Sequence, residues 1–391
     1  MDPILNPYSP GAGTKPPELA GRDELLAKAL IALRRIAAGK SAQSLILTGL
    51  RGVGKTVLLN RIRQDAEAAR LITVRMEAPE NRSLPSLLAP GLKLALMKLN
   101  RGKKATELAK RGLRTLSSFV KSMKLKYHDI EVGLDIEPEP NMLIDDLNEA
   151  LIQLFQSVGL AAKEKNTAVI LFIDELQMLD EKELGSLIMA LHIAAQDQLP
   201  IALVAAGLPQ IASKMGKAKT YAERLFEFPE IGRLNDEDAA LALTIPAEKL
   251  KVSYSKNALK EILKQTNGYA YFLQEWGKQA WDLASKSPIT ESDALEATQH
   301  ALAGLDANFF RVRFEQLTLG QKQYLRAMAE CDAQSIPSGK IAETMGKKVT
   351  DLGAVREELI TKGLIYSPSY GETAFTVPLF GDFMKRVMRD I

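Results

Sequence analysis

The feature that most constrains this chain is a glycine-rich loop between a short apolar run and a helical pattern. Residues 45–47 predict a buried strand, and a helical pattern begins at Lys55. Between them the spacing G-x-x-x-x-G-K-T is filled by Gly49, Gly54, Lys55 and Thr56. Glycine lets backbone N–H groups curl around a phosphate without a clash from Cβ. The helix that follows points its N-terminal N–H groups at the same anion. The stretch therefore predicts a strand, loop and helix that bind phosphate.

The side chains of this loop predict its ligands. The Lys55 ammonium would reach the β- and γ-phosphates of a nucleotide, and the Thr56 hydroxyl would ligate Mg²⁺. Gly52 and Val53 within the loop, and Val57 in the first helical turn, complete the segment expected to bind the nucleotide. The alternative is a glycine-rich turn with an unrelated lysine, which the strand–loop–helix context disfavours. We expect ATP and Mg²⁺ as ligands.

An acidic pair follows a second apolar run. Residues 167–175 contain five or more consecutive apolar residues and end in Asp174 and Glu175, as in a buried parallel strand with carboxylates at its C-terminal end. Asp174 would hold Mg²⁺, directly or through water, and Glu175 would orient and deprotonate an attacking water. The alternative is a simple cap at the end of a strand.

Composition excludes several classes of protein. The 391 residues are 46% apolar, enough for two or three cores, and the net charge of +3 implies no global affinity for nucleic acid. A single cysteine, Cys331, excludes a disulfide framework. The first ten residues carry prolines rather than the pattern of a signal peptide, and no apolar run approaches the ~18 residues of a membrane span. We expect a soluble, cytoplasmic protein without membrane contact.

The order of predicted elements indicates the domains. Strands at residues 71–76, 167–175 and 200–207 alternate with helices, which predicts an α/β fold with a parallel sheet covered on both faces. After Gly232 the pattern becomes helical. The expected divisions are an extended N-terminal arm at 1–18, a nucleotide-binding core at 19–232, a helical lid at 233–305 and a C-terminal domain at 306–391.

A basic segment at residues 101–141 looks inserted into the core. Nine lysines and arginines between residues 101 and 126 accompany one acid, Glu107, and the apolar residues are spaced along one helix face. Residues 125–127 and 130–136 predict a hairpin. Two interpretations stay open for the basic run: a solvated helix face, or a contact with nucleic acid or an acidic partner.

The last 75 or so residues predict three helices and a hairpin. Helices at 317–329, 338–345 and 351–362 precede strands at 364–366 and 373–377, an order that resembles a winged-helix module. In that interpretation the third helix is the recognition helix. Candidate phosphate contacts are Lys347, Lys348, Arg356 and Lys362. Against DNA contact, the third helix also carries Glu357 and Glu358, and the wing has no lysine or arginine before Glu372, as in a protein-packing module.

Taken together, these motifs resemble AAA+ ATPases, closest to the branch shared by replication-initiator ATPases and STAND-type signalling ATPases. The resemblance rests on Gly21-Arg22 with its following acids, the loop 49–56, the pair 174–175 and residues 221–226. It covers about residues 16–285 and continues into a winged-helix C-terminus. It implies a P-loop AAA+ core with a helical lid, Gly21 and Arg22 beside the adenine, and Arg224 as the arginine that reaches a neighbouring subunit's γ-phosphate. A surface salt bridge with Glu223 or Glu227 is the alternative for Arg224.

Two departures from the family pattern imply slow hydrolysis. The family usually has a polar sensor residue where this chain has Ala205-Ala206-Gly207, and residues 268–273 lack the lid arginine of the initiators. These residues are closer to the lid element of STAND proteins, although Ala270 replaces the family's proline.

Three candidate functions follow from the resemblance. The first is an ATPase that forms a homo-oligomer with ATP at the interface and couples nucleotide state to assembly on double-stranded DNA, bound through the winged helix and basic insert. The alternative is a STAND-like switch acting through protein partners, and a third is an accessory protein with negligible turnover.

Overall fold

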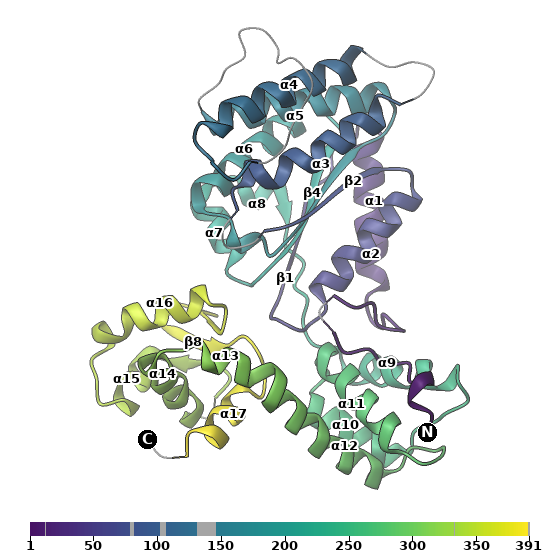
Figure 1. Ribbon diagram of the computed structural model, residues 1–391, viewed down its shortest axis with the longest axis vertical. Helices are drawn as coiled ribbons and strands as arrows, with labels where there is room; N and C mark the ends of the chain where they lie inside the picture. Colours follow the sequence, from purple (N-terminus) through teal and green to yellow (C-terminus); the bar gives the residue numbers. More distant parts are fainter. Residues whose placement is uncertain (12, 79–81, 102–106, 131–145, 332, 390–391) are drawn as a thin grey trace. The chain divides into compact units, whose positions relative to one another are not determined.

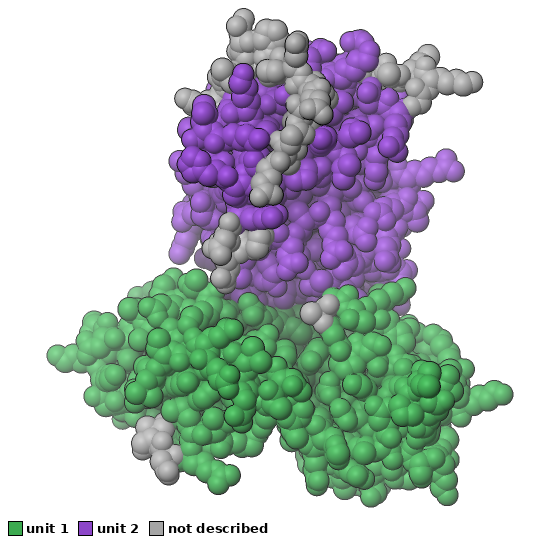
Figure 2. Space-filling view, viewed as in Figure 1, with its two compact units in different colours: residues 1–21, 50–54, 232–391 green, residues 22–49, 55–231 purple. Residues whose placement is uncertain are grey.

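The computed structural model describes residues 1–391 except 12, 79–81, 102–106, 131–145, 332 and 390–391. The described residues form two compact units, which Figure 2 colours separately. The core unit contains residues 22–49 and 55–231, and the lid unit contains residues 1–21, 50–54 and 232–391. The phosphate-binding stretch is therefore shared, because its tip at 50–54 belongs to the lid unit.

A five-stranded parallel sheet forms the centre of the core unit, in the order β2-β3-β4-β1-β5. Its strands are β1 (Ser44–Thr48), β2 (Ile72–Glu77), β3 (Val169–Asp174), β4 (Ile201–Gly207) and β5 (Phe226–Glu227). The central strands β3 and β4 are buried along their length, apart from a half-buried Asp174. Their unbroken apolar runs suit strands that are covered on both faces. The predicted α/β sheet is confirmed.

Helices cover both faces of this sheet (Figure 1). One layer contains α1 (Asp23–Ala37) and α2 (Lys55–Ala68), and the other contains α3 (Leu84–Leu99), α5 (Leu147–Glu164) and α6 (Glu181–Gln196). Two short helices, α7 (Ile211–Ala218) and α8 (Ala222–Leu225), follow β4.

The basic segment adds a further helix, α4 (Glu107–Lys124), which packs on α3 and α5. Leu113, Leu116, Phe119 and Met123 are among its buried residues, and Lys110, Arg111, Lys121 and Lys124 are exposed. The predicted amphipathic helix is confirmed. The four exposed basic residues form the charged face of this helix in the core unit.

The hairpin predicted after this helix is wrong in its first strand. Residues 125–127 form a turn, because the N–H groups of Lys126 and Tyr127 donate back to the Met123 carbonyl at 3.0 and 2.8 Å. Most of the predicted second strand lies in 131–145, outside the described residues.

Four helices form the first part of the lid unit: α9 (Asp236–Glu248), α10 (Lys256–Thr266), α11 (Ala270–Leu283) and α12 (Glu291–Gly304). A π-helical turn, η3 (Leu305–Phe310), and α13 (Arg311–Glu315) continue from α12. The N-terminal arm packs on these helices. The Tyr8 hydroxyl donates to the Leu243 carbonyl at 2.5 Å, and Trp281 Nε1 donates to the Asp2 carbonyl at 2.9 Å.

The C-terminal module, residues 318–387, combines helices with a small antiparallel sheet in the order β6-β8-β7. Its elements are α14 (Leu319–Glu330), β6 (Ile336–Pro337), α15 (Ser338–Thr344), η4 (Val349–Leu352), α16 (Gly353–Thr361), β7 (Ile365–Tyr366), β8 (Glu372–Phe375) and α17 (Phe380–Val387). The three predicted helices and two strands are present, and β6 and α17 were not predicted.

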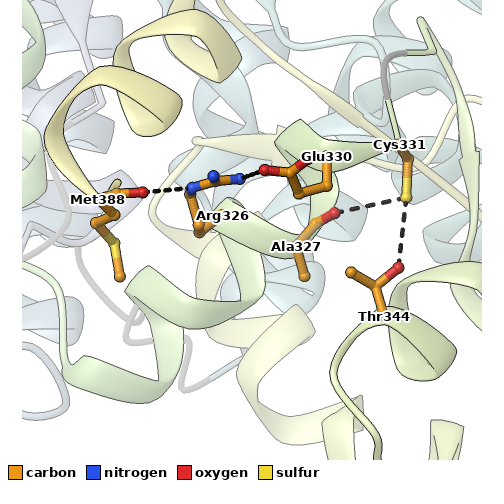
Figure 3. A network of polar contacts seen from close by, with 6 residues as sticks. All are labelled: Arg326, Ala327, Glu330, Cys331, Thr344 and Met388. Atoms are coloured by element: carbon orange, nitrogen blue, oxygen red, sulfur yellow. Dashed lines mark hydrogen bonds and ion pairs between the residues drawn. The ribbon is translucent and has the colours of Figure 1, made fainter. Parts of the chain in front are cut away.

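Polar contacts connect α14 with the residue that follows α17, and the residue after α14 with α15 (Figure 3). Arg326 of α14 is buried, donates to the Met388 carbonyl at 2.7 Å and forms an ion pair with Glu330. The Cys331 thiol lies between the Ala327 carbonyl at 3.5 Å and the Thr344 hydroxyl at 3.9 Å. Among the described residues no helix is long and apolar enough to cross a membrane.

Candidate nucleotide-binding site

The ends of three neighbouring strands bring the predicted core-unit residues together. In a parallel sheet all carboxyl ends lie at one edge, and here β4 lies between β1 and β3. The Gly49 N–H donates to the Gly207 carbonyl at 3.2 Å, which joins the start of the phosphate loop to the end of β4. The Thr56 hydroxyl donates to Asp174 Oδ2 at 2.7 Å. The two residues predicted to hold Mg²⁺ are therefore in direct contact.

The environment of Asp174 suits a cation. Burial raises the pKa of its carboxyl group, and hydrogen bonds from the Thr56 hydroxyl and the Glu175 N–H act in the opposite direction. The Glu175 N–H donates to Asp174 Oδ1 at 3.0 Å. A hydroxyl and a carboxylate at one edge are oxygen donors of the kind Mg²⁺ prefers, so these residues fit the expected ion.

Glu175 has a left-handed backbone, with φ of +53°. Non-glycine residues pay for this conformation in strain, and such residues concentrate at functional sites. Its carboxylate accepts a hydrogen bond from Gln177 Nε2, and Gln177 Oε1 accepts from the Leu208 N–H at 3.1 Å. No sequence motif points to Gln177. Its position two residues after Glu175 is the signal that could have found it.

The loop after β3 is attached to α7 by Lys214. Its ammonium donates to the Gln177 carbonyl at 2.9 Å and to the Leu179 carbonyl. Burial lowers the pKa of Lys214, and the charges of Asp180, Glu181 and Glu183 oppose that change. Lys214 therefore holds this loop by hydrogen bonds to the loop's backbone carbonyls.

The tip of the phosphate loop packs within the lid unit. The Tyr271 N–H donates to the Gly52 carbonyl at 3.0 Å, and the Tyr269 hydroxyl donates to the Arg51 carbonyl at 2.5 Å. Gly52 has φ of +83°, and a Cβ there would lie 3.0 Å from the Tyr269 ring. Gly54 has φ of +97°. Both positions therefore favour glycine.

The other residues of the stretch occupy ordinary helix and loop positions. Val53 is buried in the loop, Lys55 is buried at the start of α2, and Val57 is half-buried in its first turn. Their contacts with a nucleotide stay a prediction.

The residues predicted beside the adenine fall in different units. Gly21 belongs to the lid unit, has φ of +69°, and lies so close to Asp238 of α9 that a Cβ would come within 2.3 Å of its carboxylate oxygen. Arg22 is the N-cap residue of α1 in the core unit. Their role in adenine binding stays a prediction.

Arg224 lies in α8 and is exposed. Its carbonyl accepts a hydrogen bond from Gln43 Nε2 at 3.1 Å, and Glu227 pairs instead with Lys28 at 2.5 Å. Within the described part of the chain, the Arg224 guanidinium forms no ion pair. The salt-bridge alternative therefore has no support in this structure.

Two of the four basic residues predicted to contact DNA phosphates form hydrogen bonds within the lid unit. Arg356 donates to the Thr373 hydroxyl at 3.0 Å, the Ser367 hydroxyl at 2.8 Å and the Glu372 carbonyl at 3.1 Å. Lys362 donates to the Gln316 carbonyl at 3.1 Å and to Gln321 Oε1 at 2.9 Å. Lys347 and Lys348 are exposed.

Comparison with known proteins covers most of the chain. Residues 18–204 match the family model of the AAA ATPase domain, and residues 307–384 match a domain of unknown function. No curated protein matches the sequence.

Solved structures resemble this chain at low sequence identity. The Walker-type ATPase of Pyrococcus abyssi is 15% identical with a TM-score of 0.55, over 97% of this chain and 99% of that one. The Thermotoga maritima RuvB branch migration motor is 15% identical with a TM-score of 0.46 over 95% of each chain. The Aeropyrum pernix Orc1 protein, solved in complex with DNA, is 14% identical with a TM-score of 0.47, over 96% of this chain and 95% of that one. This chain has the α/β P-loop AAA+ fold, and its residues 18–204 are similar to the AAA ATPase domain.

Proposed function

We propose that this protein binds ATP with Mg²⁺ and hydrolyses it slowly, and that nucleotide state switches its C-terminal module. The observation that carries the hydrolytic part is the contact of Thr56 with Asp174, next to Glu175. A hydroxyl and two adjacent carboxylates at the end of parallel strands are what a P-loop ATPase needs for its metal and its water.

In this proposal each side chain has one role. The Lys55 ammonium neutralises charge on the β- and γ-phosphates, while Thr56 and Asp174 supply oxygens to Mg²⁺. The metal, when bound, withdraws charge from the phosphate oxygens. Glu175 accepts a proton from water as the water oxygen attacks the γ-phosphorus, and ADP leaves. The absence of a polar side chain at positions 205–207 supports a low rate.

The switch is supported by contacts inside the lid unit. The Tyr269 hydroxyl lies 2.5 Å from the Arg51 carbonyl and 3.4 Å from the Thr376 carbonyl. A tyrosine hydroxyl is protonated at neutral pH and can donate, and burial raises the pKa of this one further. A phenol has one proton to donate, so movement of the loop tip would change whether the Tyr269 hydroxyl donates to the Arg51 carbonyl or to the Thr376 carbonyl. The loop tip, α11 and the C-terminal module thereby share one hydrogen-bonding group.

A second candidate is assembly on duplex DNA, with Arg224 completing the site of a neighbouring subunit. It is supported by the exposed, unpaired guanidinium of Arg224 within the described residues, and by exposed lysines on the C-terminal module and on α4. The order of helices and strands in that module resembles that of a winged helix and supports this candidate. Two of the four predicted phosphate contacts, Arg356 and Lys362, donate hydrogen bonds within the lid unit, which favours the switch.

ATP hydrolysis and particle mass, measured together with and without duplex DNA, separate the two candidates. The switch predicts a monomer at every nucleotide state, with turnover that is indifferent to DNA. ATP-dependent oligomers with DNA-stimulated turnover would establish the assembling ATPase instead. A protein that binds no ATP would contradict both.

The role of Arg224 can be tested by mixing inactive variants. If it acts across a subunit interface, Arg224→Ala mixed with Lys55→Ala should recover part of the activity, because one mixed interface has both groups intact. Each variant alone is the control. The switch predicts no recovery.

A further inference from the structure

A glutamine side chain connects the proposed catalytic carboxylate to the end of β4. Gln177 Nε2 donates to Glu175 Oε2, and Gln177 Oε1 accepts from the Leu208 N–H at 3.1 Å. A backbone N–H can only donate, so the amide oxygen must face Leu208 and the NH₂ group must face Glu175. The orientation of the amide is therefore set by its partners.

This amide fills the space into which the last residue of β4 would project. A Cβ at Gly207 would lie 3.0 Å from Gln177 Oε1 and 3.3 Å from Ile211 Cβ. The two residues before it, Ala205 and Ala206, are fully buried, and their side chains are methyl groups without polar atoms. At this strand end, the polar side chain that reaches Glu175 comes from the loop after β3 instead.

The backbone that carries Gln177 is itself held in place. Lys214 donates to the Gln177 carbonyl at 2.9 Å, and the Met178 N–H donates to the Glu175 carbonyl at 2.9 Å. A side chain placed on a supported backbone can hold a neighbouring group in a defined position.

We propose that Gln177 is a positioning residue for ATP hydrolysis. It holds the Glu175 carboxylate near the end of β4, where positions 205–207 supply no polar side chain of their own. The inference rests on the proposed ATPase function, with Glu175 as the base. Gln177 acts through Glu175 and contributes little to ATP affinity.

The test is steady-state hydrolysis and equilibrium ATP binding of Gln177→Ala. We expect kcat to fall about 10- to 100-fold, because a misplaced catalytic group costs about that much. The Kd for ATP should change by less than about twofold, since an interaction used only in the transition state leaves ground-state binding unchanged. Gln177→Glu keeps the length but has no donor when ionised, and should lose as much activity.

A double variant separates positioning from general damage. If Gln177 acts through Glu175, then Glu175→Gln combined with Gln177→Ala should be no slower than Glu175→Gln alone. Additive losses would overturn the inference. So would a Gln177→Ala protein with wild-type kcat.

The matched control is Gln156→Ala. Gln156 of α5 donates a similar glutamine–carboxylate hydrogen bond to Asp197 at 2.9 Å. Asp197 precedes β4, whereas the partner of Gln177, Leu208, follows it. It should keep wild-type kcat, and thermal unfolding would show that both variants fold. If wild-type protein binds ATP without cleaving it, the proposed hydrolysis fails and this inference with it. If wild type cleaves ATP and Gln177→Ala does so equally well, only the inference fails.

Discussion

The sheet edge of the core unit and the C-terminal module use their polar side chains differently. At the sheet edge, residues singled out by motif bond to one another, as Thr56 does to Asp174. In the C-terminal module, Arg356 and Lys362 bond to hydroxyl, amide and carbonyl groups of the lid unit. A motif with defined spacing thus predicted which side chains meet. A count of basic residues did not predict which of them donate hydrogen bonds within the protein.

The difference has a physical cause. The phosphate motif combines loop geometry, a helix N-terminus and a strand end, all defined by short stretches of chain. A lysine or arginine on a small module can instead satisfy nearby carbonyls while its stem packs on apolar surface. Charge alone is therefore a weak guide to a binding surface in this protein.

The largest expected effect is at the sheet edge. Glu175→Gln keeps the size of the side chain and removes its basicity, so hydrolysis should fall about 10²–10⁴-fold while ATP still binds. Phosphate release and nucleotide binding measure the two properties. Unchanged hydrolysis would show that Glu175 is not the base. It would also mean that the sequence motif predicted roles at the sheet edge no better than the basic residues did in the C-terminal module.

Lys55→Ala should weaken the binding of ATP. Loss of a charged hydrogen-bond donor costs about 1.5–3 kcal/mol, which is about a 10- to 100-fold weaker ATP affinity. Calorimetric titration with ATP measures it. The exposed Lys40 of the core unit offers a control for loss of a positive charge, and Lys40→Ala should bind ATP normally. Equal binding by Lys55→Ala and wild type would refute the phosphate assignment.

The basic residues of the C-terminal module should differ in how much they contribute to stability, according to their hydrogen bonds. Arg356→Ala removes three hydrogen bonds to Thr373, Ser367 and Glu372, and should lower the free energy of unfolding by about 1–3 kcal/mol. Lys348→Ala, at an exposed position, should change it by less than about 0.5 kcal/mol. Chemical denaturation measures both. If the two variants are equally stable, the hydrogen bonds of Arg356 do not distinguish it from an exposed lysine such as Lys348.

The smallest effect is expected where the loop tip meets the lid unit. Tyr269→Phe removes the hydrogen bond to the Arg51 carbonyl and should cost about 0.5–1.5 kcal/mol in unfolding free energy. Tyr254→Phe is the matched control, because the Tyr254 hydroxyl donates to the Tyr8 hydroxyl at 2.8 Å within the same unit. Only Tyr269→Phe should also change ATP affinity. Equal ATP affinity in both variants would speak against the proposed switch.

The amino-acid sequence by itself determined the α/β fold, the strand that precedes the phosphate loop and the strand that ends in Asp174. These features depend on residues close together in the chain: unbroken apolar runs, and glycines where the backbone must be left-handed. The helix in the basic segment was also predictable, because its apolar residues recur along one face.

Only the tertiary structure decided which distant groups come into contact. Gln177 meets Leu208 from 31 positions away, and Tyr269 meets the Arg51 carbonyl from 218 positions away. Strand β6 was missed because its two residues have no pattern of their own and are strand only by pairing with β8. Such contacts arise when the whole chain packs, since a hydrogen bond between distant residues leaves no periodicity in the sequence.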